Sequence, residues 1–161
     1  MKSQQLIQEL LATISVKMTD LQLETQNSEY EGFTFIANNH TYRSRLAKIT
    51  PKKVGYFVTF WEKDVSNKNQ AYSYQESPDS VIITIIDGEK VGQFLFPKEI
   101  LLQKSVLRYN DCPGKMAIRV YPTWVTGLNA TAIKTQKWQS QYFIDLSITI
   151  DSKTLKSLYF E

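Results

Sequence analysis

The sequence predicts a single α/β or α+β domain in which helices flank a central mixed β-sheet. Its 161 residues match the length of one ordinary domain, and 42% hydrophobic with 22% charged residues is typical of a chain that buries a core. The 12% aromatic content argues against disorder, because disordered chains are poor in aromatic residues. Apolar runs of strand length alternate with segments of helical periodicity, which indicates one layered domain over residues 1–161.

The first segment has the periodicity of an amphipathic helix. Its apolar residues fall on one helical stripe: Leu6, Ile7, Leu10, Leu11 and Ile14. This spacing predicts a helix over about residues 3–17 that docks on the domain, with Ser3 as its N-cap. Polar residues interrupt the apolar run, so the segment does not resemble a signal peptide, and no window reaches the roughly 20 apolar residues that span a bilayer. We therefore expect a cytoplasmic protein without a membrane span.

Short apolar and aromatic runs predict the strands of the first half. Residues 32–37 and 41–47, separated by a polar turn, predict a β-hairpin. The runs 55–61 and 81–86 are apolar without alternation, which predicts central strands with both faces covered. The polar segment 63–79 between them predicts a long surface loop.

The second half alternates between strands and helices. Three elements are expected first: a strand over 91–96, a helix over 98–104 and a strand over 116–121. Asn129 is the expected N-cap of a helix that runs to about Asp145, and Asp151 is the expected N-cap of a last short helix. The order of elements predicts a mixed sheet.

Positive charge is concentrated in two segments. Residues 41–68 hold seven Lys and Arg against two Asp and Glu, a net charge of +5, whereas residues 112–144 hold four against none, a net charge of +4. In the first segment, Arg43 and Arg45 lie two residues apart on a strand and therefore share a face. A guanidinium pair on one face suits an anion.

The second basic segment has its own cationic face. Lys134 and Lys137 share a helical stripe, with Trp138 beside them. If the fold joins the two faces, they form a positive groove edged with aromatic rings, a combination that holds phosphate backbones and stacks bases. We therefore predict binding of nucleic acid or another phosphate-bearing ligand, against the competing interpretation that these faces serve solubility. The candidate residues are Arg43, Arg45, Lys48, Lys53, Trp61, Arg119, Tyr121, Lys134, Lys137 and Trp138.

A divergent Mg²⁺-dependent nuclease is the enzymatic alternative. Such an enzyme needs an acidic residue at a strand end and an Asp/Glu-x-Lys motif on the next strand, so that carboxylates hold the metal and the Lys orients the water. Asp79 precedes the strand 81–86, but the next strand lacks the motif, so a metal would depend on Asp79 or Asp87 with Glu89. We assign no catalytic residue, metal site or cofactor, and binding without catalysis is favoured.

The remaining chemistry of the chain is sparse. Cys112 is the single cysteine, so no intramolecular disulfide can form, and with the lone His40 it is too little for a zinc site. Trp61, Trp124 and Trp138 suggest an apolar pocket for a small molecule or protein partner. The oligomeric state is left open.

Five motifs stand in order between Glu29 and Asp145: residues 42–48, 50–61, 92–98, 114–122 and 135–139. In this combination the chain resembles the MepB family of bacterial proteins. The resemblance implies a bacterial cytoplasmic protein with a restriction-endonuclease-like core, and a relative encoded beside a multidrug efflux pump and its MarR-type regulator. It therefore adds a third possible function, a module linked to multidrug resistance. The motifs coincide with the two basic segments.

Overall fold

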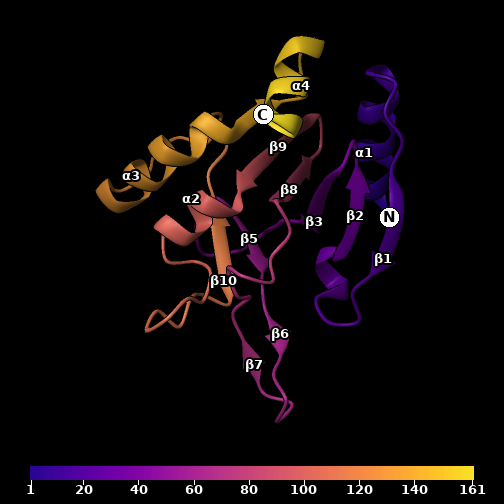
Figure 1. The fold of residues 1–161 in the computed structure, drawn as a ribbon. Helices are drawn as coiled ribbons and strands as arrows, with labels where there is room; N and C mark the ends of the chain where they lie inside the picture. The colour runs from indigo at the N-terminus through magenta and orange to yellow at the C-terminus, as the bar shows by residue number, and fades with distance from the viewer.

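A six-stranded mixed sheet is the centre of the computed structural model, which describes residues 1–161 (Figure 1). Its strands are Thr19–Leu23 (β1), Phe33–Ala37 (β2), His40–Leu46 (β3), Ser80–Asp87 (β8), Lys90–Pro97 (β9) and Phe143–Asp145 (β11). They lie in the order β1-β2-β3-β8-β9-β11, with β3 and β8 parallel and every other pair antiparallel. With four helices, this arrangement confirms the predicted fold class. The restriction-endonuclease-like core stays a prediction.

A smaller sheet joins two strands of the crossover that leads from β3 to β8 to one strand from the second half of the chain. It contains Lys48–Ile49 (β4), Tyr56–Thr59 (β5) and Ala117–Val120 (β10) in the order β10-β5-β4. As predicted for residues 55–61, β5 is a central strand, but only one of its faces is fully covered: Tyr56 and Val58 are buried, whereas Phe57 and Thr59 are half-buried. The small sheet therefore has a covered face and an open face.

The predicted surface loop 63–79 also contains structure. A short hairpin, Glu62–Lys63 (β6) with Asn69–Gln70 (β7), projects from the body of the protein (Figure 1). The chain then turns inward, and Tyr72 is 3% exposed because its ring packs against that of Phe60. The polar composition of residues 63–79 therefore did not indicate that Ala71, Tyr72 and Ser73 are buried.

The helices are Lys2–Thr13 (α1), Lys98–Gln103 (α2), Ala130–Gln139 (α3) and Ser152–Phe160 (α4), with 3-10 turns at Ser28–Tyr30 and Ser140–Tyr142. Asn129 and Asp151 are N-caps as predicted, and their side chains accept hydrogen bonds from the amides of Ala132 and Lys153. Ser3 is not a cap. It lies inside α1, where its hydroxyl donates to the carboxylate of Glu31.

The helix expected to run to about Asp145 ends at Gln139, and the chain continues as β11. Phe143 pairs with Phe94 and Asp145 with Gly92, so that β11 covers the free edge of β9. A Cβ at Gly92 would lie 2.5 Å from Cζ of Phe143, so this pairing requires the glycine.

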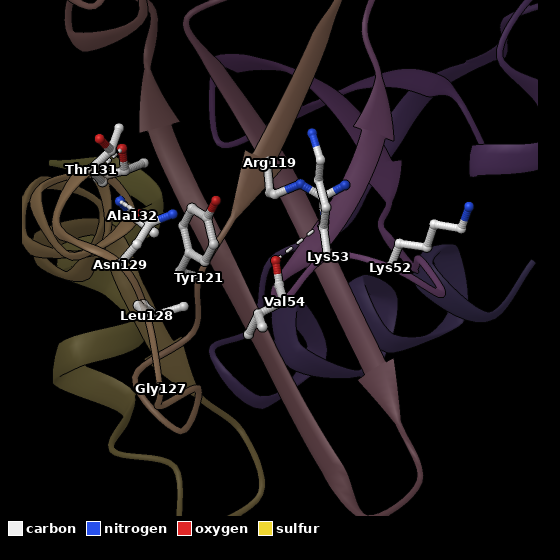
Figure 2. A pocket seen from close by; sticks show the side chains of 11 residues that line it. Lys52, Lys53, Val54, Arg119, Tyr121, Gly127, Leu128, Asn129, Thr131 and Ala132 are labelled. Atoms are coloured by element: carbon white, nitrogen blue, oxygen red, sulfur yellow. Dashed lines mark hydrogen bonds between the residues drawn. The ribbon is translucent and has the colours of Figure 1, made fainter.

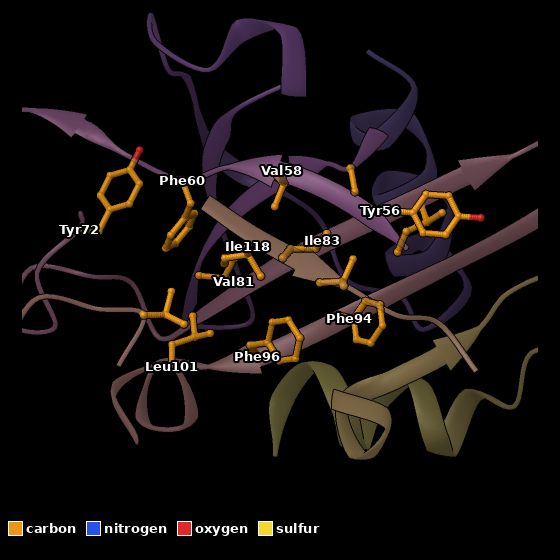
Figure 3. Packing of buried hydrophobic residues seen from close by; sticks show 14 of the residues in the cluster. Tyr56, Val58, Phe60, Tyr72, Val81, Ile83, Phe94, Phe96, Leu101 and Ile118 are labelled. Carbon is orange, nitrogen blue, oxygen red and sulfur yellow. The ribbon is translucent and has the colours of Figure 1, made fainter. Parts of the chain in front are cut away.

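Two hydrophobic cores lie on opposite faces of the large sheet. On one face, the side chains of Val58 in β5 and Phe60 just after it belong to one cluster with Ile83, Phe94 and Phe96 of the large sheet (Figure 3). On the other face, α1 and α4 cover the sheet through residues such as Ile7 and Leu155. The strand β8 supplies both cores, which explains its continuous apolar run.

Candidate functional site

A basic groove lies on the open face of the small sheet, between β10 and α3. It consists of two adjoining cavities of about 460 and 320 Å³, which share Arg119, Tyr121 and Thr135. Cationic side chains from four parts of the chain line the groove: Lys52, Lys53, Lys104, Lys115 and Arg119. No aspartate or glutamate lines either cavity. The groove is therefore a site of uncompensated positive charge.

The alternation of β10 places Arg119 in the groove. Ile118 and Val120 point into the core, so Arg119 between them points to the open face. Its guanidinium donates to Thr50 Oγ1 at 3.0 Å and to the Val54 carbonyl at 3.3 Å, and these two bonds hold the side chain in place. Figure 2 shows the bond to Val54. Arg119 has no carboxylate partner within 4.0 Å, so its charge remains available to a ligand.

Lys52 and Lys53 stand opposite α3. Both are exposed in the loop between β4 and β5, and neither forms an ion pair. Figure 2 shows Lys53 beside Arg119, with Tyr121 between Arg119 and the first turn of α3. The amino end of a helix carries partial positive charge, so it reinforces the field of these side chains.

Two amide side chains of α3, the buried Gln139 and the half-buried Gln136, tie this helix to β10 and to the segment after it. Gln139 is 1% exposed, and it accepts a hydrogen bond from the Tyr121 amide at 2.9 Å and donates to the Arg119 carbonyl at 3.0 Å. Gln136 donates to the carbonyls of Pro122 and Val125. The bonds of Gln139 join the two walls of the groove, and those of Gln136 join α3 to the segment that follows β10, so the position of α3 is built into the fold.

The structure brings four of the predicted site residues together in this groove: Lys53, Arg119, Tyr121 and Trp138. Lys134 and Lys137 are exposed on α3 but line neither cavity. Lys52 and Lys115 belong to the same basic segments, whereas Lys104 comes from an acidic segment and gave no sequence signal. Lys104 lines the groove beside Trp138, and its Nζ lies 5.3 Å from the Trp138 ring centroid.

Arg43 and Arg45 lie elsewhere, in an internal cluster around Glu24. Arg45 is fully buried, with its Nη2 2.7 Å from Glu24 Oε2, and Arg43 Nε is 2.9 Å from Glu24 Oε1. The Tyr72 hydroxyl donates to Glu24 at 2.8 Å and accepts from Arg45 at 2.8 Å. Arg45 therefore contacts no dissolved ligand. The guanidinium pair that sequence reasoning placed at an anion site is instead bonded to the internal carboxylate of Glu24.

The cluster shifts two pKa values. Burial raises the pKa of Tyr72 to about 12, so its hydroxyl keeps its proton. Burial also raises the pKa of Glu24, but the charges and hydrogen bonds of Arg45 and Arg43 outweigh burial and bring it below the ordinary value of 4.5. Glu24 is thus ionised in the folded protein.

We expect acid to destabilise the fold through Glu24. A carboxyl with a lower pKa when folded contributes stability above its unfolded pKa, and that contribution is lost as pH falls through the folded pKa. Urea midpoints should therefore decrease from about pH 5 to about pH 3, and less steeply in Glu24→Gln than in the wild type. Glu76→Gln, at an exposed carboxylate without an ion pair, is the control. Equal pH dependence of Glu24→Gln and wild type would contradict this role.

The carboxylates of the nuclease alternative serve as hydrogen-bond acceptors. Asp79 accepts from the amide and hydroxyl of Thr41 at 2.9 and 3.1 Å, and Asp87 accepts from the Tyr56 hydroxyl at 2.6 Å. No group of three or more His, Cys, Asp or Glu side chains is gathered where it could hold a metal ion. The geometry therefore offers no donor set to this alternative.

The three tryptophans do not line one pocket. Trp138 lies in the basic groove against Phe96, whereas Trp61 lines a separate cavity. Trp124 packs edge-on against Phe143 and donates to the Tyr56 hydroxyl at 3.2 Å. The arrangement does not form the shared apolar pocket that the sequence suggested.

Fold and groove together define a class: an α+β domain in which a small second sheet and a helix enclose a basic groove beside a mixed six-stranded sheet. A sequence model described as MepB-like matches residues 24–145, and the chain belongs to this MepB-like family. The chain is similar to the protein in a crystal structure of MepB, with 47% identity and a TM-score of 0.82 over 92% of this chain and 99% of that one. No curated protein matches the chain. None of its helices has the length and apolar character needed to cross a membrane.

Proposed function

We propose that the chain binds nucleic acid, or another ligand that carries phosphate groups, in the basic groove. The observation that carries the proposal is the convergence of Lys52, Lys53 and Arg119 on a cavity of about 460 Å³ without a carboxylate in its wall. These residues come from both basic segments of the sequence. A polyanion relieves the repulsion among such cations and releases its own counterions on binding.

The types of side chain in the groove favour phosphate over a single carboxylate. Arg119 presents a planar set of donors that matches phosphate oxygens, and the lysines act as point charges around it. Tyr121 and Trp138 are half-buried aromatic residues in the same groove, where bases can stack. The exposed Lys134 and Lys137 extend the positive field along α3.

Anisotropy of labelled oligonucleotides tests the proposal. Short single- and double-stranded DNA and RNA are titrated with the protein at low and at physiological salt, with and without Mg²⁺. We expect binding at low salt and an affinity that falls linearly with salt on logarithmic axes. Absence of binding to all four at low salt would overturn the proposal. Cleavage products formed only with Mg²⁺ would favour the nuclease alternative.

A further inference from the structure

The two cavities of the basic groove differ in their walls. The cavity of about 460 Å³ is lined by Lys52, Lys53 and the first turn of α3, and Tyr121 is its only aromatic residue (Figure 2). The cavity of about 320 Å³ also has lysines, but it adds a second ring, Trp138, and apolar residues such as Val106. Small-molecule sites in proteins have volumes of about 300–1,000 Å³, so each cavity can accept one nucleotide unit. The groove therefore has a cationic cavity and an aromatic cavity.

Arg119 and Tyr121 line both cavities, and donor atoms at this junction are free. Both hydrogen bonds of the Arg119 guanidinium use Nη1, so Nε and Nη2 have no partner in the protein. The Tyr121 hydroxyl and Trp138 Nε1 have none either, and protein atoms close off none of these four atoms. Each of the four carries an N–H or O–H, so the junction suits a ligand rich in acceptor oxygens.

The Tyr121 ring has a rigid backing. Gly55 has a φ of +90°, and a Cβ at this position would lie 2.7 Å from Tyr121 Cε1, so glycine is needed for the ring to pack against the backbone. The Tyr121 amide is also held, because it donates to Gln139 at 2.9 Å. The ring is thus in place between the two cavities before a ligand binds, which lowers the entropy cost of binding.

Trp138 lines the aromatic cavity together with Lys104. The Trp138 ring centroid is 5.4 Å from that of the buried Phe96, which supports the ring from the core, and 5.3 Å from the Lys104 Nζ. Lys104 forms no ion pair. Its flexible side chain is therefore free to move from the ring to a phosphate when a base stacks on Trp138.

The hollow shape of the site distinguishes between strand types. Duplex DNA is commonly read by a convex element, a helix or a β-ribbon, that enters a DNA groove about 12 Å wide. In a duplex the bases are also stacked and paired, so a base cannot reach Trp138 without leaving the helix. An unpaired strand can turn a base into the aromatic cavity while its phosphate stays at Arg119.

We propose that the groove binds an unpaired nucleic-acid strand, with one base stacked on Trp138 and the adjoining phosphates at Arg119, Lys52 and Lys53. The aromatic cavity holds the base, and the cationic cavity holds the phosphates. This inference rests on the proposed function and adds the strand type and the place of the base to it.

The test compares three labelled probes of equal length at low salt: a single strand without self-complementarity, its duplex, and an abasic strand that keeps the phosphates. We expect the wild type to bind the single strand at least about fivefold more tightly than either other probe, because a stacked base contributes that factor or more. Trp138→Leu keeps an apolar side chain against Phe96 and removes the stacking surface. It should weaken single-strand binding by about fivefold and so remove the difference from the abasic strand.

Tryptophan fluorescence of the wild type gives a second readout. The single strand should quench the emission because a base stacks on Trp138, whereas the abasic strand should not. Should Trp138→Leu fail to fold, this comparison decides, and equal quenching by both strands would overturn the inference.

Trp61→Leu is the matched control, since Trp61 lines a separate cavity, and it should keep the wild-type difference between the probes. Equal wild-type affinity for the single and abasic strands, binding of the duplex as tight as that of the single strand, or a difference that survives Trp138→Leu would overturn the inference. Salt-dependent binding would still support the proposed function in each of these cases. Absence of binding to all three probes would overturn both.

Discussion

Replacement of Arg45 by alanine is expected to lower the free energy of unfolding by about 3–5 kcal/mol, a large share of the roughly 5–15 kcal/mol typical of a domain. Arg45 is fully buried and donates to Glu24, Tyr72 and the Thr59 carbonyl, so its loss removes a donor from each of these groups and opens a void. Urea unfolding followed by circular dichroism measures the change.

A second variant distinguishes loss of the ion pair from loss of packing. Arg45→Met removes the charge but retains most of the apolar volume, and Arg43 still pairs with Glu24, so this variant should be more stable than Arg45→Ala. A cost below about 1 kcal/mol for Arg45→Ala would contradict the role of the cluster.

The second large effect is expected on ligand binding, from Lys52→Ala combined with Lys53→Ala. Both lysines are exposed and form no ion pair, so the double variant should keep the wild-type urea midpoint. Its affinity for a single-stranded oligonucleotide should fall on the order of tenfold at low salt, because two phosphate contacts are lost.

The matched control is Lys17→Ala combined with Lys156→Ala, which removes the same charge from exposed positions outside the groove. We expect this control to change affinity much less. An equal loss in both double variants would show that only net charge matters, and would contradict a localised site.

Much of the fold could be predicted because the strands that build the core have continuous apolar sequences. β8 is a continuous apolar run covered on both faces, and β9 is also covered on both faces although Gly92 and Gln93 interrupt its apolar residues. β1 was not predicted, since its sequence TDLQL is almost entirely exposed at the sheet edge and has no apolar pattern. The end of α3 depends on the contact of Phe143 with Gly92, which lies 51 residues earlier (143 − 92) and leaves no local signal.

The candidate site was predictable only in part, for a related reason. Charge counting found Lys53 and Arg119, which line the groove and have no carboxylate partner. It could not tell them from Arg43 and Arg45, whose partner Glu24 follows the unpredicted strand β1. Whether a cation is free or neutralised depends on tertiary contacts, and only the structure separated the two pairs.

The central claim is that phosphate groups occupy the groove at Lys52, Lys53 and Arg119. The most direct test is the slope of log affinity against log salt for a single-stranded oligonucleotide, measured for the wild type and for the variant with Lys52→Ala and Lys53→Ala. Each phosphate contact contributes about 0.7 to the slope, so removal of two lysines should reduce its magnitude by about 1.4. Parallel lines for the two proteins would contradict the claim, because neither lysine would then contact a phosphate.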